Sequence, residues 1–167
     1  MRPEIVRFDA AVDRAFDKIR GPAVDGVAYR LSSAADHSLL WHMCGAAVAV
    51  ARGGDVQYAA RFAAAMGAES LLTNGAVKSV FGRLRPREYA DIEFSHGLHR
   101  PITSSFPSGH ATAAFCAATL LGGGPWYALA GTVAATRVYV RLHHASDVAA
   151  GAAFGLALGV AFRRFVR

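Results

Sequence analysis

Two adjacent histidines in the stretch "TRVYVRLHHASD" give the clearest sign of chemistry in this chain. His143 precedes Asp147 by four residues, so on a helix the carboxylate would lie beside the imidazole, fix its tautomer and free its far nitrogen. His144 would point about 100° away around the helix and has no equally placed carboxylate. We therefore expect His143 to be a nucleophile. Arg137, near the end of the preceding predicted helix, would supply a bidentate phosphate ligand.

A pair of cations in "KSVFGRLRP" is expected at the end of another helix. Lys78 and Arg85 are seven residues apart, or two helical turns, so both would project from one face. Pro86 disfavours helix at Arg85 and marks the helix end. A solvated cationic face would look the same, so this pattern alone does not identify a phosphate site.

The stretch "SSFPSGH" predicts a helix start that can bind an anion. Pro107 suits the first helical position, where its missing N–H costs nothing. The free N–H groups around Ser108 and Gly109 would then point at one spot, as they do at helix N-termini that hold phosphate. Gly109 would let the anion approach the backbone, and Ser108 would donate a further hydrogen bond. His110, in the first turn, would reach a leaving-group oxygen.

In this order, the three patterns resemble the tripartite signature of the type 2 phosphatidic acid phosphatase superfamily. The matching patterns are Lys-x6-Arg-Pro, Pro-Ser-Gly-His and Arg-x5-His-x3-Asp, within residues 78–147, and Thr136 stands where the family usually has serine. The resemblance implies an all-α core and a phosphatase that needs no metal or other cofactor.

The resemblance also implies a role for each residue of the signature. His143 would attack phosphorus in line and form a phosphohistidine, with Asp147 orienting the imidazole. His110 would protonate the leaving oxygen and later activate water. The equatorial phosphate oxygens would be held by Lys78, Arg85, Ser108, the Gly109 N–H and Arg137.

Apolar stretches that alternate with polar loops predict the helices that position these residues. Beyond residue 35 we expect helices at 36–51, 56–82, 107–121, 125–142 and 146–163. Extended into their polar flanks, these helices approach the roughly 20 residues that cross a bilayer. In the last of them, Gly151, Gly155 and Gly159 recur every four residues and would let a neighbouring backbone approach closely. Glu69 interrupts an apolar run, and we expect it to make a structural hydrogen bond there, because an unpaired acid would be costly.

The first 21 residues have the pattern of an amphipathic helix, with Ile5, Phe8, Val12 and Phe16 at three- and four-residue spacing. Such a helix would either pack on the core or lie in the membrane interface. We therefore predict one domain over residues 1–167. Its fold would be an all-α, integral-membrane bundle of about five spanning helices, preceded by this helix.

Composition leaves three kinds of partner open. A net charge of +6 suits nucleic acid, an anionic membrane surface or a phosphorylated substrate. Nucleic acid is disfavoured, since the arginines are dispersed and no basic–aromatic interleaving appears. A His-His-Asp metal site at residues 143–147 is disfavoured because no other carboxylate–histidine pair has ligand spacing. A silent phosphate-binding membrane protein is disfavoured because every expected catalytic side chain is present.

The substrate and the orientation of the site are harder to predict. The bias toward Arg, Ala, Gly and Val is typical of a GC-rich bacterial genome. With the chain's size and the family resemblance, it favours an actinobacterial cell-wall substrate, decaprenylphosphoryl-5-phosphoribose. Polyprenyl diphosphate is the first alternative, followed by phosphatidic acid or phosphatidylglycerophosphate. Positive charge gathers on the face that carries the three motifs, so we expect the site to face the cytoplasm from the plasma membrane. Residues 87–106 and the first helix should discriminate among these substrates.

Overall fold

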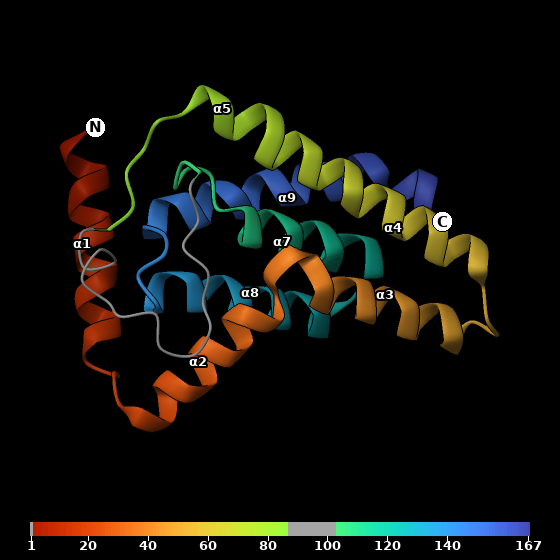
Figure 1. Cartoon of the computed structure of the whole chain (residues 1–167), viewed down its shortest axis with the longest axis horizontal. Helices are drawn as coiled ribbons and strands as arrows, with labels where there is room; N and C mark the ends of the chain where they lie inside the picture. Colours follow the sequence, from red (N-terminus) through yellow and green to blue (C-terminus); the bar gives the residue numbers. More distant parts are fainter. Residues whose placement is uncertain (1, 87–102) are drawn as a thin grey trace.

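The computed structural model describes residues 2–86 and 103–167, and no strand occurs among them. The expectation for residues 87–102 therefore lies outside the described residues. The chain begins with α1 (Pro3–Asp17) and α2 (Pro22–Ala34), and a 3₁₀ turn (Asp36–Ser38) leads into α3 (Leu39–Ala51). Next come α4 (Val56–Ser70), a π-helical segment (Leu71–Val77) and α5 (Lys78–Val80). The last helices are α7 (Gly109–Leu121), α8 (Gly124–Tyr139) and α9 (Ala145–Val166) (Figure 1).

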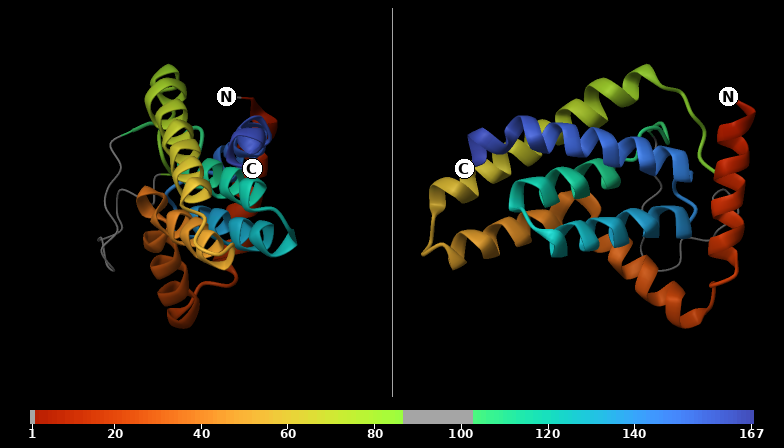
Figure 2. Two further views of the ribbon diagram at one scale, coloured as in Figure 1. Left: turned by 90° about the vertical axis from the view of Figure 1, so that its right-hand side faces the viewer. Right: turned by 180° about the vertical axis from the view of Figure 1, so that it is seen from behind.

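Helix α7 forms the centre of a bundle whose long helices run along the molecule (Figures 1 and 2). It packs against α9, α8, α4 and α3, and most of its side chains are buried. The main core combines small residues of α7 with larger ones from α3 and α4, including Trp41, Phe62 and Met66. The all-α prediction is thereby confirmed for the described residues.

The glycines of α9 bring its backbone against that of α7. A Cβ placed on Gly155 would lie 2.2 Å from the carbonyl oxygen of Thr112, and one placed on Gly151 would lie 2.5 Å from that of Ser108. At Gly159 the nearest atom would be the Cβ of Thr119, at 2.5 Å. The predicted close approach at the four-residue glycine spacing is confirmed.

The N-terminal helices cover one end of the bundle. Helix α1 crosses the end at which α8 finishes and α9 begins, whereas the C-terminus and the α3–α4 turn lie at the opposite end (Figure 2). The amphipathic helix is confirmed as α1; Phe16 packs on Tyr139, while Ile5 and Phe8 are exposed. Helix α2 was not predicted, since no helix was expected between the first 21 residues and residue 36.

Several helix ends differ from the predictions by a few residues, most clearly at the end of α5. The helix expected over 56–82 ends at Val80, and the chain then becomes extended at Phe81. Hydrogen bonds from Ser105 N to Arg83 O and from Ser105 Oγ to Leu84 O replace helical bonds there. Among the described helices, α9 alone has the length and apolar composition to cross a bilayer by itself, and α7 is apolar but shorter. The number of spans stays a prediction.

Candidate active site

Six of the eight predicted site residues line one cavity of about 320 Å³. They come from four parts of the fold: α5, the extended segment after it, the first turn of α7, and the region from the end of α8 to the start of α9. The six are Lys78, Arg85, Gly109, His110, Arg137 and His143. The other two, Ser108 and Asp147, are buried outside the cavity lining. The cavity therefore gathers both histidines and three cations.

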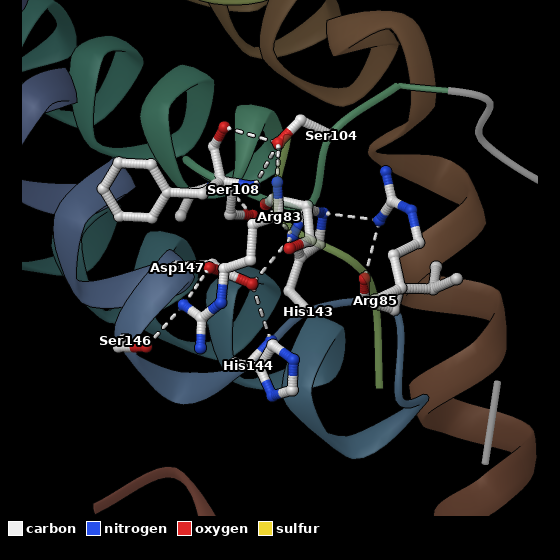
Figure 3. Close-up of polar contacts among 12 residues, drawn as sticks. Arg83, Arg85, Ser104, Ser108, His143, His144, Ser146 and Asp147 are labelled. Carbon is white, nitrogen blue, oxygen red and sulfur yellow. Dashed lines mark hydrogen bonds and ion pairs between the residues drawn. The ribbon is translucent and has the colours of Figure 1, made fainter. Parts of the chain in front are cut away.

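The imidazole of His143 is held with one nitrogen turned toward Arg85 (Figure 3). Its Nδ1 lies 2.7 Å from the carbonyl oxygen of Ser105, which can only accept, so Nδ1 carries the proton and Nε2 keeps the lone pair. Arg85 donates to that Nε2 over 3.3 Å. Burial lowers the pKa of His143 to about 3, and nearby cations, first among them Arg85, add to the lowering although Asp147 opposes it. The imidazole is therefore neutral at physiological pH, as a nucleophile must be.

Asp147 does not orient His143 in the way that the sequence suggested. Helix α9 begins only at Ala145, so His143 precedes the helix, and its Nδ1 is 3.8 Å from Asp147 Oδ2, within ion-pair range but beyond a hydrogen bond. Asp147 instead accepts from the His144 N–H at 2.9 Å, in a capping box at the helix start, and pairs with Arg83. The carboxylate can still stabilise positive charge on His143, while the tautomer is fixed by Ser105.

His110 is paired with a carboxylate that the sequence analysis did not single out. Its Nε2 lies 2.8 Å from Oδ1 of Asp36, in the 3₁₀ turn before α3. The same carboxylate is 3.9 Å from Arg137, which also donates to Ser32 Oγ and is only 2% exposed. Asp36 therefore orients the His110 ring and can share the proton of its Nε2. A contact between residues 74 positions apart leaves no local signal in the sequence.

The start of α7 differs from the prediction by two residues. The helix begins at Gly109, so Ser108 is its N-cap and accepts from the Ala111 N–H at 3.4 Å, while Pro107 precedes the cap. The Ser108 side chain is fully buried and serves the helix start rather than the cavity. A Cβ on Gly109 would lie 2.8 Å from Asn74 Oδ1 and 3.4 Å from Lys78 Nζ. Gly109 therefore lets the π-helical segment bring Lys78 against the first turn of α7.

Lys78 and Arg85 do meet at the cavity, but not on one helix face. Lys78 is on α5 and is 8% exposed, whereas Arg85 lies in the extended segment that follows. Arg85 is held by donating to the carbonyls of Leu142, at 2.6 Å, and Thr103, at 3.2 Å. The predicted hydrogen bond of Glu69 is confirmed, with Thr73 Oγ1 donating over 2.9 Å, and Glu69 also lines the cavity.

The arrangement is suited to moving a phosphoryl group. It offers a neutral imidazole with a fixed lone pair, three cations that can neutralise phosphate oxygens, and a second imidazole paired with a carboxylate. Among residues 2–86 and 103–167, no group of three His, Cys, Asp or Glu side chains is placed to hold a metal ion.

Comparisons with known proteins agree with this chemistry. Residues 58–167 match the model of the PAP2 superfamily. The chain is 40% identical, over 92 residues, to a lipid A 1-phosphatase of Porphyromonas gingivalis; the match covers 49% of this chain and 18% of that protein. The chain thus spans less than a fifth of the length of this curated relative.

The fold matches a solved structure of a transmembrane enzyme. The crystal structure of a PAP2-type phosphatidylglycerolphosphate phosphatase from Bacillus subtilis superposes with a TM-score of 0.75. The superposition covers 98% of this chain and 87% of that one, at 24% sequence identity, and so shows a shared fold. With the family match over 58–167, which includes all three motifs, the chain belongs to the PAP2 superfamily, also called the type 2 phosphatidic acid phosphatase superfamily.

Proposed function

We propose that this protein is a membrane phosphatase that hydrolyses a phosphate monoester of a lipid through a phosphohistidine on His143. The observation that carries the proposal is the state of His143. Its Nδ1–H donates to the Ser105 carbonyl, so Nε2 carries the lone pair, and His143 lines the cavity. The same cavity is lined by Lys78, Arg85 and Arg137. A nucleophile amid three cations matches the needs of an attack on a phosphate dianion.

The reaction follows from these positions in two steps. His143 Nε2 forms a bond to phosphorus as the bond from phosphorus to the lipid oxygen breaks, and His110 gives its proton to that oxygen. The phosphorylated imidazole is then positively charged, because Nδ1 keeps its proton, and Asp147 at 3.8 Å stabilises it. In the second step His110 takes a proton from water, whose oxygen attacks phosphorus and releases inorganic phosphate and His143.

The second part of the proposal is that the substrate headgroup carries hydroxyl groups near the phosphate. Besides the cations, the cavity is lined by polar side chains of the 3₁₀ turn and of α4 with its π-helical extension: Asp36, His37, Ser38, Glu69, Ser70 and Asn74. Glycerol phosphate and phosphoribose headgroups have hydroxyls that such groups can bind, and polyprenyl diphosphate has none. The proposed substrates are therefore phosphatidylglycerophosphate, a lipid A 1-phosphate and decaprenylphosphoryl-5-phosphoribose. The relatives support the first two, and size and composition support the third.

The membrane location rests on the fold and on α9. The fold is shared with a transmembrane enzyme, and α9 can cross a bilayer by its length and composition. In this proposal the protein crosses the plasma membrane several times. The site then lies at the end of the bundle that α1 covers, where a lipid headgroup can enter from the interface. The excess of positive charge at that end supports a cytoplasmic orientation.

Phosphate release by detergent-solubilised protein in EDTA tests the proposal. The panel comprises the three proposed substrates, phosphatidic acid and a polyprenyl diphosphate, each with wild type and His143→Ala. We expect wild type to release phosphate without added metal, fastest from a monoester with headgroup hydroxyls, and His143→Ala to be inactive. If wild type released phosphate no faster than His143→Ala from every substrate, the proposal of a phosphatase would be wrong. If wild type preferred the polyprenyl diphosphate, the phosphatase would stand and only the proposed substrate class would be wrong.

A further inference from the structure

A buried ion-pair cluster joins the N-terminal helix to the carboxylate beside His143. Arg83 lies between two carboxylates: its Nη2 is 2.7 Å from Asp9 Oδ2, and its Nη1 pairs with Asp147 Oδ1. The exposed fractions of the three side chains are 12% for Arg83, 6% for Asp9 and 0% for Asp147. Asp9 comes from α1, outside the residues that match the family model.

Ser146 closes the same cluster from the first turn of α9 (Figure 3). Its N–H donates to Asp9 Oδ1 at 2.8 Å, its hydroxyl donates to Asp9 Oδ2 at 2.9 Å, and Arg83 Nη1 donates to its oxygen at 2.8 Å. Asp9 is therefore bound both to Arg83 and to the residue next to Asp147. A side chain of α1 thus fixes the helix start that carries Asp147.

The charges of the cluster match the charge that His143 acquires in the proposed reaction. At rest Asp9, Arg83 and Asp147 sum to one negative charge. When His143 is phosphorylated and its ring becomes positive, the four groups together are neutral. Without Asp9, the positive charge of Arg83 would be neutralised by Asp147 alone, and the cluster would have no net negative charge to stabilise the imidazolium.

We propose that Asp9 and Arg83 are positioning residues for this reaction: they hold Asp147 beside His143 and balance its charge, so that α1 completes the active site. The inference rests on the proposed function. Neither residue lines the cavity, so each acts through Asp147 rather than on the substrate. An effect on kcat with little effect on KM follows from that arrangement.

A second acid of α1 provides a control that weakens the docking of this helix without changing Asp9. Asp13 and Asp17 follow Asp9 at four-residue intervals, so the three acids share one face of α1. Asp13 and Asp17 both pair with Arg141, each at 2.6 Å. Asp13→Asn weakens the docking of α1, but it keeps the Arg141–Asp17 pair and the contacts described above for Asp9, Ser146 and Asp147.

The test compares kinetics of wild type, Asp9→Asn, Arg83→Lys and Asp13→Asn, with melting temperatures alongside. We expect Asp9→Asn to lower kcat about tenfold at unchanged KM, within the usual range of coupling between contacting charged residues. Arg83→Lys keeps the charge but cannot bridge two carboxylates, so kcat falls with it too. Asp13→Asn should lose a similar amount of thermal stability to Asp9→Asn yet keep its kcat. Equal kcat values for Asp9→Asn and Asp13→Asn would overturn the proposal.

A double-mutant cycle with Asp147→Asn separates positioning from a general structural effect. If Asp9 acts through Asp147, then Asp9→Asn changes kcat less than about threefold in the Asp147→Asn background. The same tenfold loss in both backgrounds would overturn the proposal.

A binding readout distinguishes a failure of this positioning role from a failure to find the substrate. Orthovanadate adopts the five-coordinate geometry of a phosphoryl group under attack, and its bond to His143 would raise the melting temperature. We expect this rise to be smaller in Asp9→Asn than in Asp13→Asn. Equal rises would contradict the positioning role even if no substrate of the wild-type enzyme were found.

Discussion

Gly155, where α9 meets α7 backbone to backbone, gives a direct test of the packing that positions the site. An alanine Cβ there would lie 2.2 Å from Thr112 O and 3.0 Å from Cys116 N, whereas ordinary contacts begin near 3.4 Å. The atoms in the way belong to the backbone of a buried helix and cannot rotate aside. The two helices must therefore separate by about 1 Å, and such overpacking costs up to about 3 kcal/mol.

The expected change in melting temperature follows from this cost. Alanine favours helix over glycine by about 1 kcal/mol, so the net loss for Gly155→Ala is about 2 kcal/mol. At about 2–4 °C per kcal/mol for a chain of this size, the melting temperature should fall by about 4–8 °C. The measurement is thermal unfolding in detergent, followed by tryptophan fluorescence, for which the fully buried Trp41 is a reporter.

Gly131→Ala is the matched control, because this glycine is also helical and a Cβ there would meet nothing within 4 Å. We expect it to melt at or slightly above the wild-type temperature, since only the propensity gain of about 1 kcal/mol applies. If Gly155→Ala melted within about 2 °C of Gly131→Ala, the backbone contact of α7 and α9 would not be as close as described and the reasoning would fail.

Three further predictions concern the site itself. His144→Ala should keep substantial turnover, because His144 caps α9 rather than reaching the cavity; an inactive His144→Ala beside an active His143→Ala would reverse the assignment. Asp36→Asn should slow phosphate release from a lipid, whose alkoxide needs a proton from His110, but hardly from p-nitrophenyl phosphate; equal slowing would contradict the role of Asp36. The low pKa of His143 means that the folded protein binds fewer protons there than the unfolded chain between about pH 6.5 and 3. Stability should therefore fall on acidification through this window, with a shallower slope of melting temperature against pH in His143→Asn; an equal slope would contradict the shift.

The side chains that meet at the cavity were predictable where the sequence has a local rule. The order and spacing of the three motifs identified Lys78, Arg85, His110, Arg137 and His143, and the structure places all of them around one cavity. The close approach of α9 to a neighbouring helix was predictable for the same reason, because residues four positions apart lie on one face of a helix. The helix boundaries were less accurate, because hydrogen bonds between distant segments decide where α5 ends.

The partners of the two histidines could not be predicted from the sequence. The group that fixes the tautomer of His143 is a backbone carbonyl, at Ser105, and every residue has one, so no pattern of side chains reveals it. The carboxylate beside His110 comes from 74 residues away, and Asp9 is 137 residues from Ser146. Arg83 stands among other arginines and has no distinguishing spacing.

The two unpredicted carboxylates come from the same part of the chain, and this bears on how the site works. Asp9 and Asp36 both lie before residue 58, where the family match begins, and each supports one half of the proposed reaction: Asp36 pairs with the proton donor His110, and Asp9 supports Asp147 beside the nucleophile. The motifs supply the groups that would contact phosphate, and the N-terminal segment supplies the carboxylates that pair with His110 and Arg83. Because Asp9 of α1 pairs with Arg83, a shift of this helix on the end of the bundle would reach Asp147 through Arg83.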